Sequence, residues 1–381
     1  MMIRTAFSSF VIFLSLIVFF FKGFSQQDKA EACIKDLMQR SQLVGLTAAV
    51  VRDNKIVYTL NLGYKNLESQ TPLTDDCLFR IASISKSFTA TSIMQLIEAK
   101  KLSLKDDVSK LVGFKVRNPR FPDQVITLRM ILSHTSSLND SQGYFSLDAI
   151  NPDKNPNWEK CYSDYAPGAG YKYCNLNFNM AGTILERVSG ERFDQYVKHH
   201  ILDPLGLYGG YCVDSLDQSR FATLYEYNTS EEKFIAAPAA YAARREEIAN
   251  YTMGYSTPIF SPTGGMKITA ADLARYMTMH MNLGKYEGKR IISKKSARRM
   301  QSLIAKEDGY GLAIVTTSSL IAGKVMKGHT GSAYGLFSTM FFHPKEKFGI
   351  VVITNGYHSS IPGGLKPIVN CLYDHVIAKQ P

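Results

Sequence analysis

The chain has 381 residues, of which 45% are hydrophobic and 20% charged, and its formal net charge is +11. This length is ample for a large core in one domain or in two closely joined domains. The basic residues are scattered and form no motif with aromatic residues, so we expect no nucleic acid partner. A basic exported protein would instead meet acidic surfaces or anionic substrates.

The first 25 residues have the pattern of a secretory signal peptide. Arg4 supplies positive charge, residues 11–21 are almost wholly apolar, and Gly23–Ser25 places small residues at a cleavage site. The alternative is an uncleaved membrane anchor, but the apolar run is short for a span of roughly 20 residues. We expect residues 1–25 to be removed, leaving a periplasmic or secreted chain, 26–381, with no stable membrane span. The removed segment carries two basic residues and no acidic one, so +11 falls by two to +9.

The order of expected elements predicts an α+β fold. An amphipathic helix at about 28–42 precedes two β-rich runs, 46–51 and 56–60, whose short polar turn is typical of a hairpin. The middle is largely helix and loop, and residues 207–260 look irregular. Later elements are expected as helices at 176–189, 191–201, from Thr269 and at 364–378, and as strands at 312–315, 324–327, 336–343 and 348–353.

Strands at both chain ends predict an antiparallel sheet built from those ends and flanked by helices, with a helical insertion between them. The expected sheet region covers about 26–80 and 300–381, and the helical region about 81–300. The sequence shows no internal repeat, low-complexity tract or interdomain linker.

The segment around Ser83 has the pattern expected for nucleophilic catalysis. Ser83 is expected in the first turn of a buried helix, and Lys86 follows on the same face. A serine hydroxyl needs a base, and a lysine serves only when burial or positive neighbours lower its pKa. The pattern alone is weak, because Ser230 and Lys233 repeat it in a polar loop. An N-cap serine beside an ordinary lysine is the alternative.

Two further motifs follow in order. Tyr173 and Asn175 form Tyr-x-Asn about 90 residues after Ser83, and His329-Thr330-Gly331 precedes Ser332 on an expected strand. With the Ser-x-x-Lys pattern, this ordered set resembles the penicillin-recognising serine hydrolases. The branch is that of class C β-lactamases, D-alanyl-D-alanine carboxypeptidases and related esterases, and the resemblance covers about residues 30–375.

The resemblance implies a β-lactamase/transpeptidase-like fold and a role for each motif residue. Ser83 would attack a carbonyl, and Lys86 and Tyr173 would share the proton transfers. Tyr173 could act as a base only if a cation such as Lys86 lowered its pKa. Asn175 would orient Lys86 and the substrate amide, and the backbone N–H groups of Ser83 and Ser332 would hold the oxyanion. His329, Thr330 and Gly331 would bind substrate on the strand. We expect no cofactor and no metal ion.

Three departures from the family pattern bear on function. Ser137 stands where the family often has glycine, so that turn could differ. Cys174 is usually another small residue and either packs or pairs with Cys161. His329 replaces the lysine of β-lactamases, which favours a D,D-peptidase or esterase over an efficient β-lactamase. The expected substrates are peptidoglycan-like D-alanyl peptides, esters or β-lactams, and the alternative is a penicillin-binding sensor or scaffold with slow or no turnover.

Six cysteines in an exported chain allow 15 disulfide pairings. Because the terminal helices of this family pack on the same face of the sheet, the resemblance implies a Cys33–Cys371 bridge. His134 raises the alternative of a Ser-His-Asp triad, but the sequence has no Gly-x-Ser-x-Gly elbow, so we expect a structural histidine. Trp158 and the tyrosines of 207–260 could line a cleft or simply pack.

Overall fold

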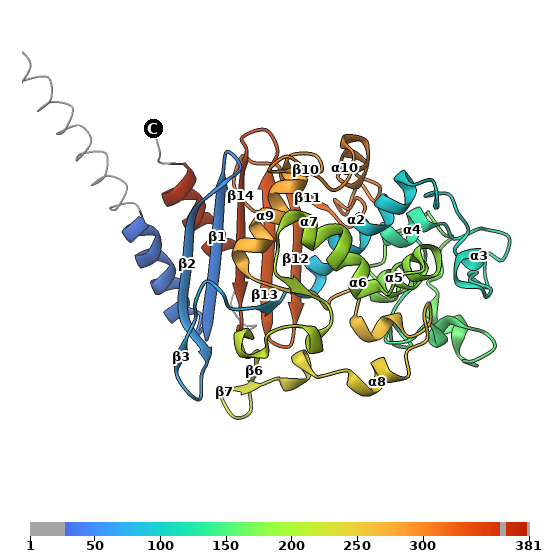
Figure 1. Cartoon of the computed structure of the whole chain (residues 1–381), viewed down its shortest axis with the longest axis horizontal. Helices are drawn as coiled ribbons and strands as arrows, with labels where there is room; N and C mark the ends of the chain where they lie inside the picture. Colours follow the sequence, from blue (N-terminus) through green and yellow to red (C-terminus); the bar gives the residue numbers. More distant parts are fainter. Residues whose placement is uncertain (1–26, 359–362, 379–381) are drawn as a thin grey trace, which may run out of the picture.

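The computed structural model describes residues 27–358 and 363–378, so the predicted signal peptide, 1–25, lies outside the described residues. Its centre is an antiparallel sheet in the order β11-β12-β13-β14-β1-β2-β3 (Figure 1). The strands are β1 (Gly45–Arg52), β2 (Lys55–Asn66), β3 (Thr71–Pro72), β11 (Val315–Thr317), β12 (Met326–Ala333), β13 (Leu336–His343) and β14 (Phe348–Thr354). The expected α+β fold, with a sheet built from both chain ends, is confirmed.

Strand β1 joins the two ends of the chain, because it lies between its hairpin partner β2 and the last strand, β14. Its register with β14 runs from Leu46 opposite Thr354 to Arg52 opposite Phe348. At the tip of the predicted hairpin, Asp53 and Asn54 have φ angles of 49° and 70°. Both are left-handed, as a tight two-residue hairpin turn with the native twist requires.

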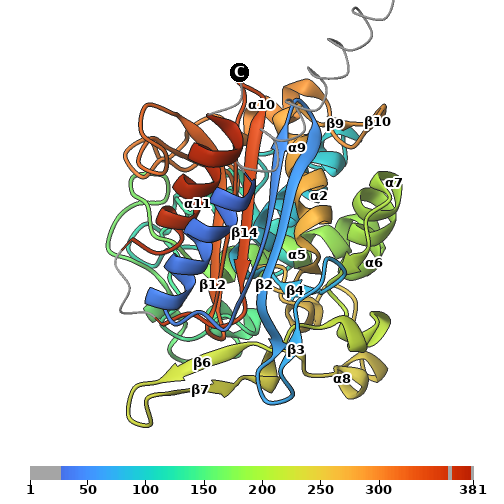
Figure 2. The same cartoon turned by 90° about the vertical axis from the view of Figure 1, so that its left-hand side faces the viewer.

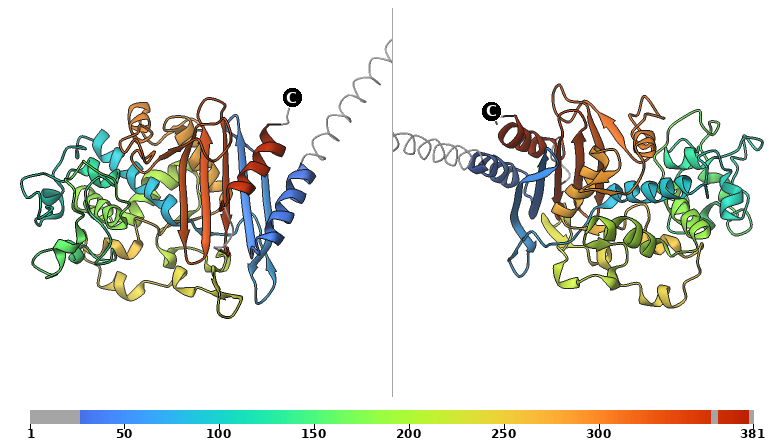
Figure 3. Two further views of the ribbon diagram at one scale, coloured as in Figure 1. Left: turned by 180° about the vertical axis from the view of Figure 1, so that it is seen from behind. Right: turned by 45° about the horizontal axis from the view of Figure 1, so that its top comes forward.

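Helices cover both faces of the sheet. Helix 27–40 and α11 (Lys366–Leu372) lie side by side on the outer face (Figure 2), while α9 (Ala270–Met281) and the helical region lie on the other side (Figure 3). Each face has its own buried apolar core. Cys33 and Cys371 join the two outer helices, with their Cα atoms 6.5 Å apart, so the structure confirms the predicted bridge.

The remaining elements form the helical region and three small sheets. Helices α2 (Ser85–Glu98) and α5 (Asn175–Ser189) lie at its centre. Around them are α3 (Val108–Val112), α4 (Leu128–Leu132), α6 (Phe193–Val197), α7 (Asp203–Leu205), α8 (Arg245–Ala249) and α10 (Lys294–Met300). The short strands are β4 (Phe79–Arg80), β5 (Gly209–Gly210), β6 (Tyr225–Asn228), β7 (Lys233–Ala236), β8 (Lys267–Ile268), β9 (Lys285–Tyr286) and β10 (Lys289–Arg290). No helix in the described ranges is long and apolar enough to cross a membrane.

Several local expectations need correction. Residues 312–315 were expected as a strand, but Ala313 has a φ of 56° and the N–H of Gly311 binds the carbonyl of Ile314. The chain therefore turns there, and β11 begins only at Val315. Strand β12 likewise begins at Met326 and continues through the His-Thr-Gly motif. The segment 207–260, expected to be irregular, contains the β6–β7 hairpin.

Candidate active site

Ser83 lies where strand β4 gives way to helix α2. It is in a one-turn 3-10 helix, Ala82–Ile84, just before α2 and not within it. The preceding Ala82 has a φ of 45°, a strained conformation for a residue with a side chain. The hydroxyl of Ser83 does not cap the helix, because α2 has no side-chain cap. This excludes the N-cap alternative for Ser83.

Lys86 is fully buried beneath Ser83. Its Nζ donates to Oγ of Ser83 (3.1 Å), to Oδ1 of Asn175 (2.9 Å) and to the carbonyl of Thr263 (2.8 Å). These three bonds use all three donors of an ammonium group. Burial lowers the pKa of Lys86 to about 7, although the negative charge of Asp140 partly opposes this. The amine is therefore neutral in a large fraction of molecules near neutral pH.

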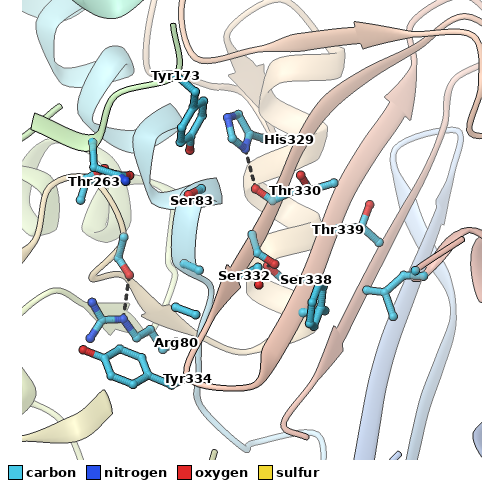
Figure 4. A pocket seen from close by; sticks show the side chains of 18 of the residues that line it. Arg80, Ser83, Tyr173, Thr263, His329, Thr330, Ser332, Tyr334, Ser338 and Thr339 are labelled. Carbon is cyan, nitrogen blue, oxygen red and sulfur yellow. Dashed lines mark hydrogen bonds between the residues drawn. The ribbon is translucent and has the colours of Figure 1, made fainter. Parts of the chain in front are cut away.

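Tyr173 points its hydroxyl toward Ser83 (Figure 4). The Nζ of Lys86 lies 4.9 Å from the centre of the tyrosine ring. Burial raises the pKa of Tyr173 well above its ordinary value, and the Ser83 hydroxyl only partly opposes this effect. The expectation that Lys86 lowers this pKa is therefore wrong. The buried ring disfavours a phenolate, so Tyr173 is a neutral phenol at neutral pH.

Asn175 is held in position by a residue that the sequence analysis missed. The carboxylate of Asp140 accepts the backbone N–H (2.8 Å) and the side-chain Nδ2 (3.0 Å) of Asn175, and also the N–H of Leu176 (3.0 Å). Because Nδ2 is bound to Asp140, Oδ1 faces Lys86 and also accepts the hydroxyl of Thr263 (2.9 Å). Asp140 thus caps α5 and sets the direction of the Asn175 amide.

His329 is 3% exposed and both of its ring nitrogens are occupied. Its Nδ1 lies 2.6 Å from the carbonyl of Thr330, which can only accept, so Nδ1 carries the proton. Its Nε2 then accepts the hydroxyl of Tyr310 at 3.0 Å. Burial, assisted by the charge of Lys86, lowers the pKa of His329 to about 4. His329 is therefore neutral and has no free donor for a substrate.

Strand β12 approaches the Ser83 turn closely at Gly331. A Cβ on Gly331 would lie 2.3 Å from the carbonyl of Ile81, so only glycine allows this approach. Thr330 and Ser332 are exposed. A cavity of about 840 Å³ opens between this strand and the helical region. Its lining includes seven of the eight predicted site residues, Ser83, Tyr173, Asn175, His329, Thr330, Gly331 and Ser332, while Lys86 lies below its floor.

His134 has a structural role. Its Nδ1 accepts the backbone N–H of Cys174 at 3.2 Å, and its Nε2 has no hydrogen-bond partner among the described residues. In the part of the chain that the structure describes, no serine forms a hydrogen bond with the His134 ring, so these residues form no Ser-His-Asp triad. Cys174 and Cys161 are both free and buried, so Cys174 packs and does not form the disulfide that the sequence had left open.

The structure also shows the surroundings of the other residues for which the sequence left two interpretations open. In the second Ser-x-x-Lys match, Ser230 lies in an exposed turn and Lys233 is the exposed first residue of β7, where it pairs with Glu231. Trp158 packs against Tyr162 with ring centres 5.8 Å apart and is absent from the lining of the cavity. Ser137 has a φ of 64°, so its turn keeps the conformation that glycine favours.

Comparisons with known proteins agree with this geometry. "Protein flp" of Staphylococcus aureus (strain MW2) is 23% identical over 352 residues, which cover 88% of this chain; the chain spans only 64% of that relative. The structure of the octameric penicillin-binding protein homologue from Pyrococcus abyssi is 26% identical with a TM-score of 0.71, over 90% of this chain and 75% of that one.

A second solved structure, the D-amino acid amidase from Ochrobactrum anthropi SV3, shares the fold. It has a TM-score of 0.71 at 18% identity, over 92% of this chain and 99% of that one. A family model described as Beta-lactamase matches residues 30–365, which is most of the chain and includes all three motifs. Sequence, fold and family model therefore agree that this chain belongs to the Beta-lactamase family, among the penicillin-recognising serine hydrolases.

Proposed function

We propose that this chain is an exported serine hydrolase that forms an acyl-enzyme on Ser83. The observation that carries the proposal is the buried amine of Lys86, 3.1 Å from the Ser83 hydroxyl, with its pKa lowered to about 7. An amine that is neutral near pH 7 can accept the serine proton as the hydroxyl attacks. All three hydrogen-bond acceptors of this amine are neutral, so no carboxylate bonded to it holds it in the charged form.

In the first step Oγ of Ser83 bonds to the substrate carbonyl carbon while its proton passes to Lys86. The carbonyl oxygen becomes an oxyanion, which the backbone N–H groups of Ser83 and Ser332 stabilise. The close approach of Gly331 to the Ser83 turn supports this assignment. The bond to the leaving group then breaks, and that group takes the proton from Lys86 by way of the neutral Tyr173 phenol. Water next attacks the acyl carbon and gives a proton to Lys86, the bond between that carbon and Oγ of Ser83 breaks, and Oγ takes the proton back from Lys86 as the acid leaves.

The substrate class follows from His329. A lysine at this position would keep a positive charge beside the cleft, whereas His329 is neutral and its donor is bound to Thr330. We therefore expect D-amino-acid amides and small esters, which need no cation at this position, to be better substrates than β-lactams with a carboxylate there. The likeness to a D-amino acid amidase and to a penicillin-binding protein homologue supports this choice.

An activity panel tests the proposal. The mature protein is assayed with nitrocefin, p-nitrophenyl acetate and a D-Ala-D-Ala peptide, with Ser83→Ala as control, and intact mass is recorded after each incubation. We expect ester or peptide turnover and an adduct on Ser83, both absent in Ser83→Ala. A stable adduct without turnover would identify a penicillin-binding sensor. An adduct that persists in Ser83→Ala would refute the assignment of the nucleophile.

A further inference from the structure

A second cavity, of about 340 Å³, adjoins the active-site cleft. The two share Arg80, Phe145, Ser261 and Tyr334 in their linings, so they lie on either side of these residues. Three basic residues, Arg80, Arg244 and Lys267, line this second cavity, and none of the described residues in its lining is acidic. We call it the cationic side pocket.

Lys267 is the most unusual residue of the cationic side pocket. It lies on β8, is only 3% exposed, and its Nζ donates to the carbonyl of Tyr211 at 2.6 Å. An ammonium has three donors, and within the described part of the chain no carboxylate lies within 4.0 Å of this one. Burial, and then the charge of Arg80, hold the pKa of Lys267 well below its ordinary value.

Arg80 is fixed in place by neutral partners alone. Its Nε donates to the carbonyl of Gly264 (2.9 Å), Nη1 to the carbonyl of Ala240 (3.1 Å) and Nη2 to Oγ of Ser261 (3.4 Å). Its guanidinium stacks on Tyr334, 5.0 Å from the ring centre, just below the Ser83 turn (Figure 4). The charge is therefore held rigidly beside the cleft but is not neutralised by any described acidic residue.

The carboxylates that act on the basic residues of this pocket are engaged with other cations. Asp194, which favours the charged form of Lys267 from a distance, binds Arg192 through both oxygens (2.6 and 3.0 Å). Arg244 has its own partner, because its Nη1 donates to Glu247 at 2.8 Å. Arg80 thus remains a confined cation without a counterion among the described residues, and beside it lies the buried amine of Lys267, whose charged form an anion in the pocket would stabilise. Buried charges are ordinarily paired, since an unpaired one costs several kcal/mol.

We propose that the cationic side pocket binds an anionic group, a carboxylate, on the substrate whose carbonyl reacts at Ser83. The inference rests on the proposed hydrolase function and specifies its substrate. The carboxylate would accept hydrogen bonds from Lys267 and lie against the Arg80 guanidinium, which supplies the missing counterion. The pocket lies on the Arg80 side of Ser83, apart from His329, so it selects substrates by where they carry their charge.

Two esters that differ only in charge test the proposal. One is p-nitrophenyl glutarate, with a free carboxylate, and the other is its methyl ester. We expect the wild type to prefer the charged ester in kcat/KM. In Lys267→Met, kcat/KM for the charged ester should fall about 10- to 100-fold, which is the usual effect of losing a hydrogen bond to a charged group. The kcat/KM for the neutral ester should stay within about twofold of the wild-type value. Lys347→Gln is the matched control, because Lys347 is also partly buried and donates to a backbone carbonyl (Met281, 3.3 Å) away from both cavities.

A binding measurement separates this proposal from the proposed hydrolase function. Calorimetry with Ser83→Ala compares monomethyl glutarate, an anion, with neutral dimethyl glutarate. We expect the anion alone to bind, and its binding to disappear when Lys267→Met is added. If the wild type hydrolyses neither ester but the anion still binds, the pocket stands and the hydrolase fails. The pocket proposal is overturned if kcat/KM falls equally for both esters in Lys267→Met, or if the folded wild type shows no preference for the anion. The wild-type comparison decides the matter even if Lys267→Met does not fold.

Discussion

The hydroxyl of Tyr310 lies 3.0 Å from Nε2 of His329 and donates to it, which leaves the proton of this histidine on Nδ1 and bound to the Thr330 carbonyl. The first residue of the His-Thr-Gly motif is thus locked as a neutral imidazole. We expect His329→Lys to raise kcat/KM for nitrocefin relative to p-nitrophenyl acetate by about fivefold, or about 1 kcal/mol, because the added ammonium would pair with the nitrocefin carboxylate in the open cleft. Equal changes for both substrates would show that this position does not select for charge.

The rate should follow the protonation of Lys86. Its pKa is lowered to about 7, and only the neutral amine accepts the Ser83 proton. We therefore expect kcat/KM for p-nitrophenyl acetate to rise about tenfold per pH unit below pH 7 and to level off above it. His329, with a pKa near 4, stays neutral over this range and adds no second limb. A profile that is flat between pH 5.5 and 8.5 would remove Lys86 as the base.

The same lysine should make stability depend on pH. The folded state binds the Lys86 proton more weakly than the unfolded state, whose pKa is the ordinary 10.5, so the destabilising effect is full below pH 7 and shrinks as pH rises. Lys86→Met removes this dependence. The difference in unfolding free energy between variant and wild type should be about 2 to 3 kcal/mol more favourable to the variant at pH 6 than at pH 9. Urea unfolding at both pH values measures it, and an equal difference at both would contradict the lowered pKa.

Asp140 should act through Asn175 and Lys86. It orients the Asn175 amide, and its charge supports the protonated form of Lys86. Asp140→Asn should lower kcat/KM by about 10- to 100-fold and move the acidic limb of the profile to lower pH. The control is Asp148→Asn, because Asp148 pairs with Lys154 (3.1 Å) on the surface. A lower rate with an unmoved limb would leave Asp140 with a structural role alone.

The Cys33–Cys371 bridge should contribute to stability and not to activity. It joins residues 338 positions apart, and closing so long a loop restricts the unfolded chain. The Cys33→Ser, Cys371→Ser double variant should lose about 2 to 5 kcal/mol in unfolding free energy and keep its kcat/KM. A non-reducing peptide map of the wild type should recover the two cysteines in one linked pair. Recovery of either as a free thiol would disprove the bridge.

Features that depend on local residue patterns or on the order of the motifs could be predicted from the sequence. The hairpin β1–β2 followed from alternating apolar runs around Asp53 and Asn54, and the cap of α9 from Thr269, whose side chain accepts the N–H of Asp272 at 3.0 Å. The antiparallel sheet followed from expected strands at both chain ends, and the site residues followed from three motifs in a familiar order. No local pattern marks Asp140, because its partners lie 35 and 36 residues away across the fold.

The contacts that set the protonation states of His329 and Tyr173 could not be predicted from the sequence. Tyr310 is 19 residues from His329, and their hydrogen bond depends on how the segment before β11 folds back. The direction of the Tyr173 pKa depends on burial, which outweighs the hydrogen bond with the Ser83 hydroxyl. Likewise, Arg80 and Lys267 look like ordinary scattered basic residues until β4 and β8 pair and bring them together. These features arise from long-range packing, which a residue pattern does not encode.

The pairing of β1 with β14 also determines when, during synthesis, the sheet beside Ser83 can be completed. Ser83 and Lys86 are made early, but the strand that faces them begins at Met326, and the sheet closes only when β14 joins β1. A nascent chain that ends before these strands contains Ser83 but lacks the strand that lies opposite it in the complete fold. Because so many contacts join distant segments, folding must wait for nearly the whole polypeptide and should be slow. We therefore expect the candidate active site to be complete only when nearly the whole chain has been synthesised.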